Sequence, residues 1–349
     1  MGYDIEKTSD DGYIVCGYSS FPGINKGLLV KTDDKGNEKW NKTFLIKGNT
    51  HFFSVEQTAD DKFIVAGRTY DTFNVTYIPL FLKVNTKGDI IWKETYNSEE
   101  DKWATSVKQT EEGGYILSGI TDTASPDTDG AFLIKTDDQG RKIWSKTYPY
   151  PSKHESEWMN KVVKSNDGGY VIAGAIRKGY HGKTLSFLMK TDKQGKLLWN
   201  KTYEIGERTS AYDITPADDG GFALTGRIHL SDEQNSKTFV IKTDNKGIIE
   251  WNKIYDIYDR SGAYSIQQTS DGGFIIGGML QESDKKYSLL LKIDNTGNQC
   301  WNKKYTGQGE MVCVDVIQDN NKGFVLTDIT SEGSGDVFLL KTTSNGDQL

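Results

Sequence analysis

The chain has little cysteine, histidine or proline. Its 349 residues include 3 cysteines (Cys16, Cys300 and Cys313), 4 histidines and 6 prolines. Three scattered cysteines give neither a disulfide framework nor the spacing of a zinc site, and the histidines also lack ligand spacing. No glycine-rich phosphate loop opens a helix. We therefore expect no metal and no other cofactor.

Long apolar runs and an excess of positive charge are also missing. No stretch of about 18 apolar residues occurs, so we expect no transmembrane helix. The net charge of −7 at pH 7 argues against a nucleic-acid partner, because phosphate binding favours a basic surface. Met1 and Gly2 lead directly into repeat sequence without a signal peptide. This start fits either a cytoplasmic protein or one whose leader has been removed.

A unit of about fifty residues recurs seven times. An aromatic residue after an acidic or Gly-rich turn marks each copy, at Tyr13, Phe63, Tyr115, Tyr170, Phe222, Phe274 and Phe324. This period, with strand-like content, predicts an all-β fold, a seven-bladed β-propeller of four-stranded antiparallel blades. We expect a single propeller domain over 1–349. Its repeats fall roughly at 1–46, 47–98, 99–150, 151–205, 206–257, 258–307 and 308–349.

The sixth repeat illustrates the expected blade, with strands over 263–269, 274–278, 288–294 and 301–305. In every repeat a third-strand lysine precedes a turn glycine by five residues, and such fixed spacing is what a hairpin register requires. The lysines are expected to pack by their stems or to form a repeated ion pair. A tryptophan follows the glycine by four residues and is expected to pack between adjacent blades. These tryptophans are Trp40, Trp92, Trp144, Trp199, Trp251 and Trp301.

The seventh repeat stops at Leu349, one residue before the expected tryptophan. The last blade is therefore expected to lack its outer strand and to leave an open edge. We expect the chain to be part of a longer polypeptide.

The connections between strands two and three, and between successive repeats, vary in length and sequence and should share one face. Such connections carry function when a scaffold holds them. Five of the six arginines lie in or beside them, and one position, twelve residues before the aromatic, holds His51, Trp103 and Trp158. The candidate ligand-binding residues are His51, Arg68, Trp103, Trp158, Arg177, Arg208, Arg227 and Arg260. Other variable connections contribute Tyr70, Phe73, Tyr77, Tyr150, Tyr180, His181 and Tyr258.

Aromatic side chains beside arginine suit flat polar ligands such as glycans, or a peptide that carries carboxylates. The alternative interpretation is that Trp103 and Trp158 only cover the top of the inner strand. Catalysis is a further alternative, because two loop carboxylates could meet at a glycosidase separation. The acids considered are Glu99, Glu100, Asp101, Glu155, Glu157, Glu207, Asp232, Glu233 and Asp259. Asp127-Thr128-Asp129-Gly130 resembles half of a calcium loop but lacks the bidentate Glu, which favours a solvated turn.

The repeat phrases resemble those of a known group of proteins. Segments Tyr115 to Tyr148 and Tyr170 to Tyr203 show a Tyr-Ile/Val-x-x-Gly strand, a Lys-Thr-Asp-x-x-Gly hairpin and a Trp-x-Lys-Thr-Tyr strand. They are similar to repeats of secreted and cell-surface proteins of bacteria and archaea, related to WD-repeat and quinoprotein-like propellers. The resemblance implies an extracellular or cell-surface location and gives no catalytic residue.

Three functions therefore remain open. The favoured one is a non-catalytic module that binds a glycan or a protein or peptide on the variable face. The others are a carbohydrate-active propeller enzyme, either a glycosidase or a lyase, and a purely structural repeat of a larger surface protein.

Overall fold

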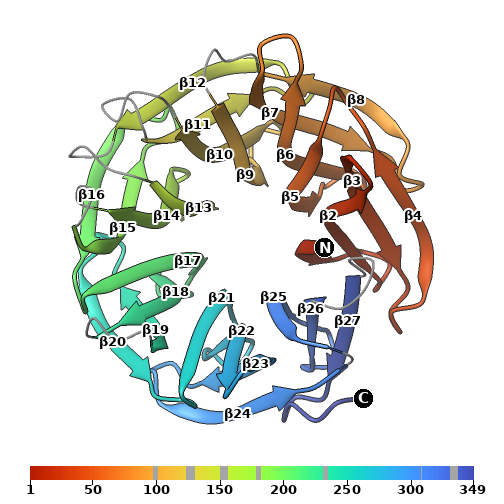
Figure 1. The fold of residues 1–349 in the computed structure, drawn as a ribbon. Coiled ribbons are helices and arrows are strands. Elements are labelled where there is room, and N and C mark those ends of the chain that lie inside the picture. Colours follow the sequence, from red (N-terminus) through yellow and green to blue (C-terminus); the bar gives the residue numbers. More distant parts are fainter. Residues whose placement is uncertain are drawn as a thin grey trace. The chain divides into compact units, whose positions relative to one another are not determined.

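The computed structural model describes residues 1–96, 101–122, 130–149, 156–177, 182–230, 235–307, 309–330 and 337–349. The side chains of Phe21, Asp122, Thr330 and residues 156–160 lie outside this description. The chain divides into two compact units, Met1–Ser156 and Glu157–Leu349 (Figure 1). Every regular element in the described ranges is a β-strand, so no helix there could cross a membrane.

Unit 1 contains three four-stranded antiparallel sheets, each formed by strands that are consecutive in the chain. The first sheet holds β1 (Gly2–Lys7), β2 (Tyr13–Phe21), β3 (Ile24–Thr32) and β4 (Glu38–Phe44). The second holds β5 (Thr50–Gln57), β6 (Phe63–Asp71), β7 (Thr76–Val84) and β8 (Ile90–Thr95). The third holds β9 (Asp101–Gln109), β10 (Tyr115–Asp122), β11 (Gly130–Thr136) and β12 (Lys142–Pro149).

Unit 2 repeats this pattern with one addition. Its first eight strands are β13 (Ser156–Lys164), β14 (Tyr170–Arg177), β15 (Thr184–Thr191), β16 (Leu197–Tyr203), β17 (Arg208–Pro216), β18 (Phe222–His229), β19 (Ser236–Thr243) and β20 (Ile249–Tyr255). They form a single eight-stranded sheet, because one parallel bridge between Thr184 and Arg208 joins β15 to β17. The next sheet holds β21 (Arg260–Gln268), β22 (Phe274–Glu282), β23 (Lys285–Ile293) and β24 (Gln299–Tyr305).

The last sheet holds three strands, β25 (Met311–Gln318), β26 (Phe324–Thr330) and β27 (Val337–Thr342). An isolated bridge between Thr342 and Gln348 brings the final residues back alongside β27. The all-β class and the four-stranded antiparallel sheets predicted from the sequence are thus confirmed. The expectation that every repeat forms a separate sheet is not, because β13 to β20 are joined.

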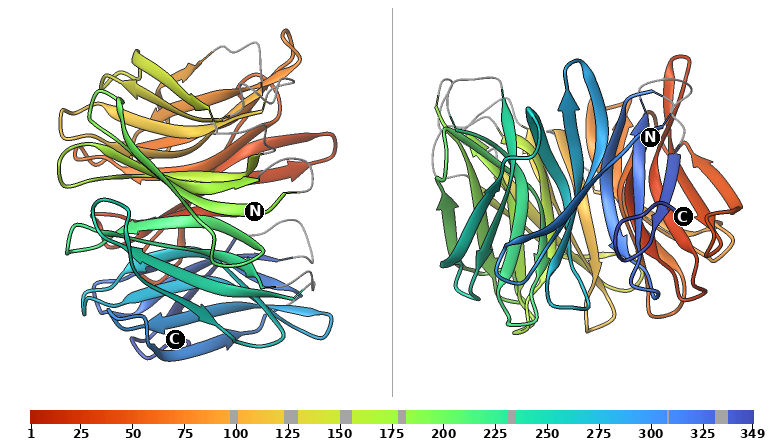
Figure 2. Two further views of the ribbon diagram at one scale, coloured as in Figure 1. Left: turned by 90° about the vertical axis from the view of Figure 1, so that its left-hand side faces the viewer. Right: turned by 90° about the horizontal axis from the view of Figure 1, so that it is seen from below.

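The strands reach further toward the variable connections than the sequence predicted. In the sixth repeat β22 continues to Glu282 and β23 begins at Lys285, so the expected loop is a hairpin with Ser283 at a φ of +52°. Within each unit the tight turns leave one end of the sheets and the variable connections leave the other (Figure 2). Arg68 and Arg227 consequently lie in strands, β6 and β18, rather than in loops.

The tight-turn end contains the repeated lysine as a buried cation. In five repeats its ammonium group reaches an aspartate in the turn between the first and second strands, which is the repeated ion pair predicted as one alternative. Each of these five aspartates is about half exposed, so one pair contributes at most about 1 kcal/mol. The pairs are Lys31–Asp10 at 2.8 Å, Lys83–Asp60 at 3.0 Å, Lys190–Asp167 at 2.6 Å, Lys242–Asp219 at 2.6 Å and Lys292–Asp271 at 3.0 Å. In the other two repeats Lys135 Nζ donates to Thr110 Oγ1 at 2.6 Å, and Lys341 pairs with the buried Asp319 at 3.2 Å.

The repeated tryptophan packs on the turn glycine of the following repeat. A Cβ placed on that glycine would lie 2.6–2.9 Å from the indole ring, and the glycine also has a positive φ. Only glycine satisfies both conditions, which explains the fixed Lys, Gly and Trp spacing. The pairs are Trp40–Gly88, Trp92–Gly140, Trp199–Gly247, Trp251–Gly297 and Trp301–Gly346. Trp144 lies 5.6 Å from the Lys146 ammonium group, measured to the ring centre.

A β-bulge interrupts the first strand of six repeats. The bulged residues are Tyr3, Phe53, Thr105, Tyr212, Tyr264 and Val314. A bulge disrupts the hydrogen-bond ladder locally. After the bulges at Phe53 and Tyr264, the backbone N–H two residues beyond the bulged residue donates to an aspartate side chain of the adjacent sheet. Val55 N donates to Asp4 at 2.8 Å, and Ile266 N donates to Asp213 at 2.8 Å.

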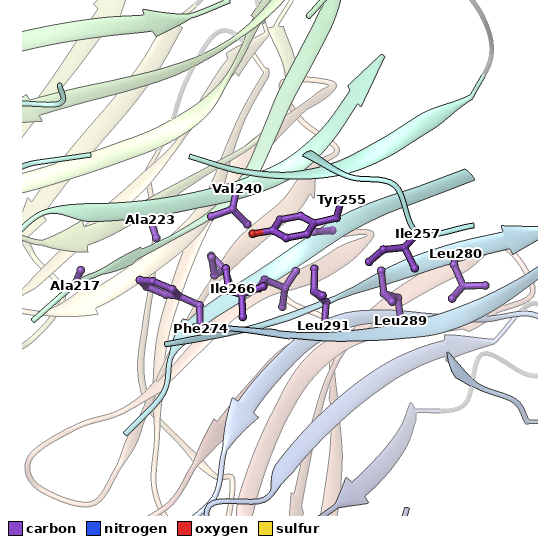
Figure 3. Close-up of a cluster of buried hydrophobic side chains, with 13 residues drawn as sticks. Ala217, Ala223, Val240, Tyr255, Ile257, Ile266, Phe274, Leu280, Leu289 and Leu291 are labelled. Atoms are coloured by element: carbon purple, nitrogen blue, oxygen red, sulfur yellow. The ribbon is translucent and has the colours of Figure 1, made fainter. Parts of the chain in front are cut away.

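The cores lie between neighbouring sheets of a unit. Figure 3 shows one of them, in which Val240 and Tyr255 of one sheet face Phe274, Leu289 and Leu291 of the next. All five side chains are buried. Buried apolar area of this kind is the main stabilising contribution, at about 25 cal/mol per Å².

Candidate functional site

Three of the predicted ligand-binding residues meet at the variable end of unit 1. Arg68 on β6 pairs in register with His51 on β5, and its Nη2 lies 3.3 Å from His51 Nδ1. The guanidinium carbon lies 4.6 Å from the centre of the Trp103 ring on β9, which belongs to the next sheet. It also lies 4.2 Å from the centre of the Tyr77 ring on β7. The guanidinium group is thus held against two aromatic faces, a favourable cation–π arrangement.

Further aromatic rings extend this group across the first sheet. Tyr18 stacks on His51, with ring centres 4.5 Å apart, and Tyr3 stacks on Tyr18 at 5.8 Å. Phe53 lies 5.3 Å from Tyr3 and 5.6 Å from the Arg68 guanidinium carbon. We call the complete set the Arg68 cluster: Tyr3, Tyr18, His51, Phe53, Arg68, Tyr77 and Trp103. All of its members except His51, which is 8% exposed, are partly exposed.

The cluster carries one positive charge. Burial, and secondly the charge of Arg68, together lower the pKa of His51 to about 4. The imidazole is therefore neutral at pH 7, and its Nδ1 accepts from Arg68 because a guanidinium group can only donate. Burial also lowers the pKa of Arg68, but an arginine stays protonated at this pH.

Arg68 has donor capacity that the protein does not use. Its Nε is buried without a hydrogen-bond partner, and none of the ion pairs among the described residues includes Arg68. The neighbouring Asp101 is already engaged, because its Oδ1 accepts from Tyr77 N and from Thr76 Oγ1, both at 2.6 Å. The exposed part of the guanidinium group, beside two aromatic faces, can therefore offer N–H donors to an oxygen of a ligand.

The other predicted residues belong to unit 2 or lie outside the description. Arg177 is at the end of β14, Arg208 at the start of β17, Arg227 within β18 and Arg260 at the start of β21. Arg227 Nη2 donates to the Tyr264 hydroxyl at 2.7 Å, and Tyr264 stacks on Tyr212 at 5.5 Å. Trp158 is in β13, but its side chain is not described.

Sequence reasoning missed Tyr3, Tyr18 and Phe53 in unit 1, and Tyr212 and Tyr264 in unit 2. Four of these five occupy the bulged position, ten residues before the second-strand aromatic. A recurrent aromatic at that position was visible in the sequence.

Few of the candidate catalytic acids can be placed. The structure does not describe five of these acids or the side chain of a sixth: Glu99, Glu100, Glu155, Asp232 and Glu233, and the Glu157 side chain. Residues 127–129 of the calcium-like segment, and the predicted aromatic residues Tyr150, Tyr180 and His181, also lie outside the described residues. Glu207 forms an ion pair with Lys183 at 3.3 Å. In the described ranges, no group of three or more His, Cys, Asp or Glu could hold a metal ion.

No protein-family model matches the chain, and a search of curated protein sequences finds no relative. Solved structures do resemble it. A protein of unknown function from Bacteroides caccae is 12% identical, with a TM-score of 0.53 over 84% of this chain and 94% of that one. Sqt1 from Chaetomium thermophilum is 10% identical, with a TM-score of 0.54 over 100% and 82% of the two chains. An ulvan lyase is 9% identical, with a TM-score of 0.59 over 98% and 91%.

These similarities support a fold of the β-propeller type, to which Sqt1 and the ulvan lyase belong. Identities near 10% extend to the fold alone. Because the neighbours include both a WD40 protein and enzymes, the fold does not separate binding from catalysis.

Proposed function

We propose that this chain is a non-catalytic binding module, a seven-bladed β-propeller whose ligand is a glycan held by the Arg68 cluster. The observation that carries the proposal is the Arg68 guanidinium group between Tyr77 and Trp103, with a buried Nε that has no hydrogen-bond partner. A polar group left unsatisfied in this way is costly unless a ligand completes it.

The aromatic content favours a sugar ring over other ligands. Partly exposed rings at Tyr3, Tyr18, Tyr77 and Trp103 offer flat apolar faces and polar edges. A pyranose has the matching character, with C–H groups on its faces and hydroxyl groups at its rim. The Arg68 fork can donate to two adjacent hydroxyl oxygens of the sugar or to a carboxylate.

Binding without catalysis accounts for the described acids. Asp101, one of the candidate acids that the structure describes, acts on Arg68 through its charge, and its Oδ1 accepts from Tyr77 N. A general acid needs a proton at working pH and access to the leaving group. Asp101 Oδ1 is instead occupied by the donors Thr76 Oγ1 and Tyr77 N.

The proposed location is the cell surface or the extracellular space. This proposal comes from the resemblance of the repeats to secreted and surface proteins. A glycan ligand is consistent with it. Immunoblotting of surface-exposed and cytoplasmic fractions from the native organism would test the location.

A glycan array followed by titration calorimetry tests the function. Arg68→Lys keeps the charge but removes the fork, and Trp103→Leu removes one stacking face. Each should weaken binding of the array ligand at least tenfold. Arg141→Lys is the matched control, because the exposed Arg141 pairs with Asp137 at the tight-turn end.

Thermal unfolding of each variant would establish that it is folded. Unchanged binding by the Arg68→Lys, Trp103→Leu double variant would contradict the site. If a peptide array gave a ligand that needs both residues while no glycan bound, the site would stand and the ligand class would be wrong.

A further inference from the structure

Arg227 in unit 2 occupies the same repeat position as Arg68 in unit 1, five residues after the second-strand aromatic. The two sites differ in what the next repeat contributes. Trp103 covers Arg68 from the position twelve residues before its own aromatic, and the same position beside Arg227 is Gly262. The indole ring that packs on Arg68 therefore has no counterpart beside Arg227, where the equivalent residue is a glycine without a side chain.

Arg227 uses the space that this glycine leaves. A Cβ on Gly262 would lie 2.9 Å from Arg227 Nε, so the guanidinium group lies directly against β21. Its Nη2 donates to the Tyr264 hydroxyl at 2.7 Å, which fixes one side of the fork. Nε itself is buried and has no hydrogen-bond partner.

A second arginine lies on the same strand face as Gly262. Arg260 stands two residues before Gly262 in the regular part of β21, ahead of the bulge, so both residues face the same side of the strand. Arg260 Nε is also buried without a hydrogen-bond partner. None of the ion pairs found among the described residues includes Arg227 or Arg260.

We infer that Arg227 and Arg260 form an oxyanion site in unit 2 that is separate from the Arg68 cluster. Two like-charged guanidinium groups on one face repel each other. A sulfate, phosphate or carboxylate group relieves this repulsion, because it neutralises the charges and accepts from the N–H groups on the exposed parts of the two side chains. This inference does not depend on the glycan proposal.

The same oxyanion could be a free ion or a substituent of a polysaccharide. Inorganic sulfate and a sulfated disaccharide, titrated separately by calorimetry at constant ionic strength in chloride buffer, distinguish the two sources. Tighter binding of the disaccharide would assign the site to a substituted glycan, and equal affinities would assign it to the free ion. Either result supports the site.

Arg227→Gln and Arg260→Gln should each weaken sulfate binding at least tenfold, and Arg141→Gln should leave it unchanged. Gly262→Ala keeps both charges but displaces Arg227, since the new methyl group meets a side chain rather than backbone. It should weaken binding at least threefold without loss of thermal stability. Sulfate affinity that is unchanged in the folded Arg227→Gln, Arg260→Gln double variant, or undetectable in the folded wild type, would overturn the inference. Arg68→Lys should not affect sulfate binding, so the two sites can fail independently.

Discussion

Asp328 should make the protein less stable as the pH rises. The fourth residue after the second-strand aromatic is glycine in six repeats and Asp328 in the seventh. Asp328 is fully buried in β26, where Oδ1 accepts from Ser288 Oγ at 2.8 Å. Oδ2 is buried without a hydrogen-bond partner. Burial raises the pKa of Asp328 to about 6, although the hydrogen bond from Ser288 opposes this effect.

The sign and size of the effect follow from proton linkage. Below about pH 4 the carboxyl group is protonated in both the folded and the unfolded chain and contributes no difference. Between about pH 4 and pH 6 the unfolded chain releases this proton while the folded chain keeps it, so the free energy of unfolding decreases. A rise in pKa from 3.8 to about 6 corresponds to a loss of about 3 kcal/mol at neutral pH.

Urea denaturation followed by tryptophan fluorescence, at intervals from about pH 4 to pH 8, measures this loss. Asp328→Asn and Asp328→Gly both abolish the titration and differ in packing, so their absolute stabilities will differ. In each variant the unfolding free energy relative to wild type should increase by about 3 kcal/mol across the range. Ser288→Ala removes the hydrogen bond to the carboxylate and should steepen the wild-type decline. Parallel curves for wild type and Asp328→Asn would refute the reasoning.

Three further predictions concern stability. Lys322 has a φ of +63° at a turn position where four other repeats have glycine, so Lys322→Gly should raise the unfolding free energy by about 0.5–1 kcal/mol in urea. The Tyr305 hydroxyl donates to Gly346 O at 2.6 Å, whereas the equivalent residue of the first repeat is Phe44. Tyr305→Phe should therefore cost about 1 kcal/mol and Phe44→Tyr should gain a similar amount, and no change in either would dismiss this hydrogen bond as a stabilising contact. Since burial and Arg68 lower the pKa of His51 to about 4, folding should weaken as the pH falls from about 6.5 to 4, and His51→Gln should show a shallower loss over that window.

The sequence predicted the tight-turn end of the sheets in detail. Lysine, glycine and tryptophan keep fixed spacing there because each contacts a neighbouring turn, as Lys292 does with Asp271 and Trp251 with Gly297. Because several contacts constrain them at once, the lysine and the turn glycine recur in all seven repeats and the tryptophan in six. Recurrence of this kind can be read directly from one sequence.

The variable end could be predicted only in part. His51, Arg68 and Trp103 were selected because they differ between repeats, and the structure brings them together. Their partners Tyr3 and Phe53, which occupy the bulged position of the first strand, were not predicted. A bulge arises from the pairing of two strands, and residue periodicity within one strand does not report it.

The position of the candidate sites follows from what the two ends of each sheet must do. At the tight-turn end, nearly every polar group is committed to a turn or to the adjacent sheet, so a substitution there costs stability directly. The position of Arg68 and Arg227 is different, because the same position holds Tyr18, Ile120, Ala175, Met279 and Ile329 in the other repeats. A position that accepts such different side chains does not determine the strand pairing. It does lie on a strand whose backbone is fixed on both sides, so a functional group placed there is held rigidly. Ligand contacts can therefore change at this position without destabilising the sheet, and loops are not needed to carry them.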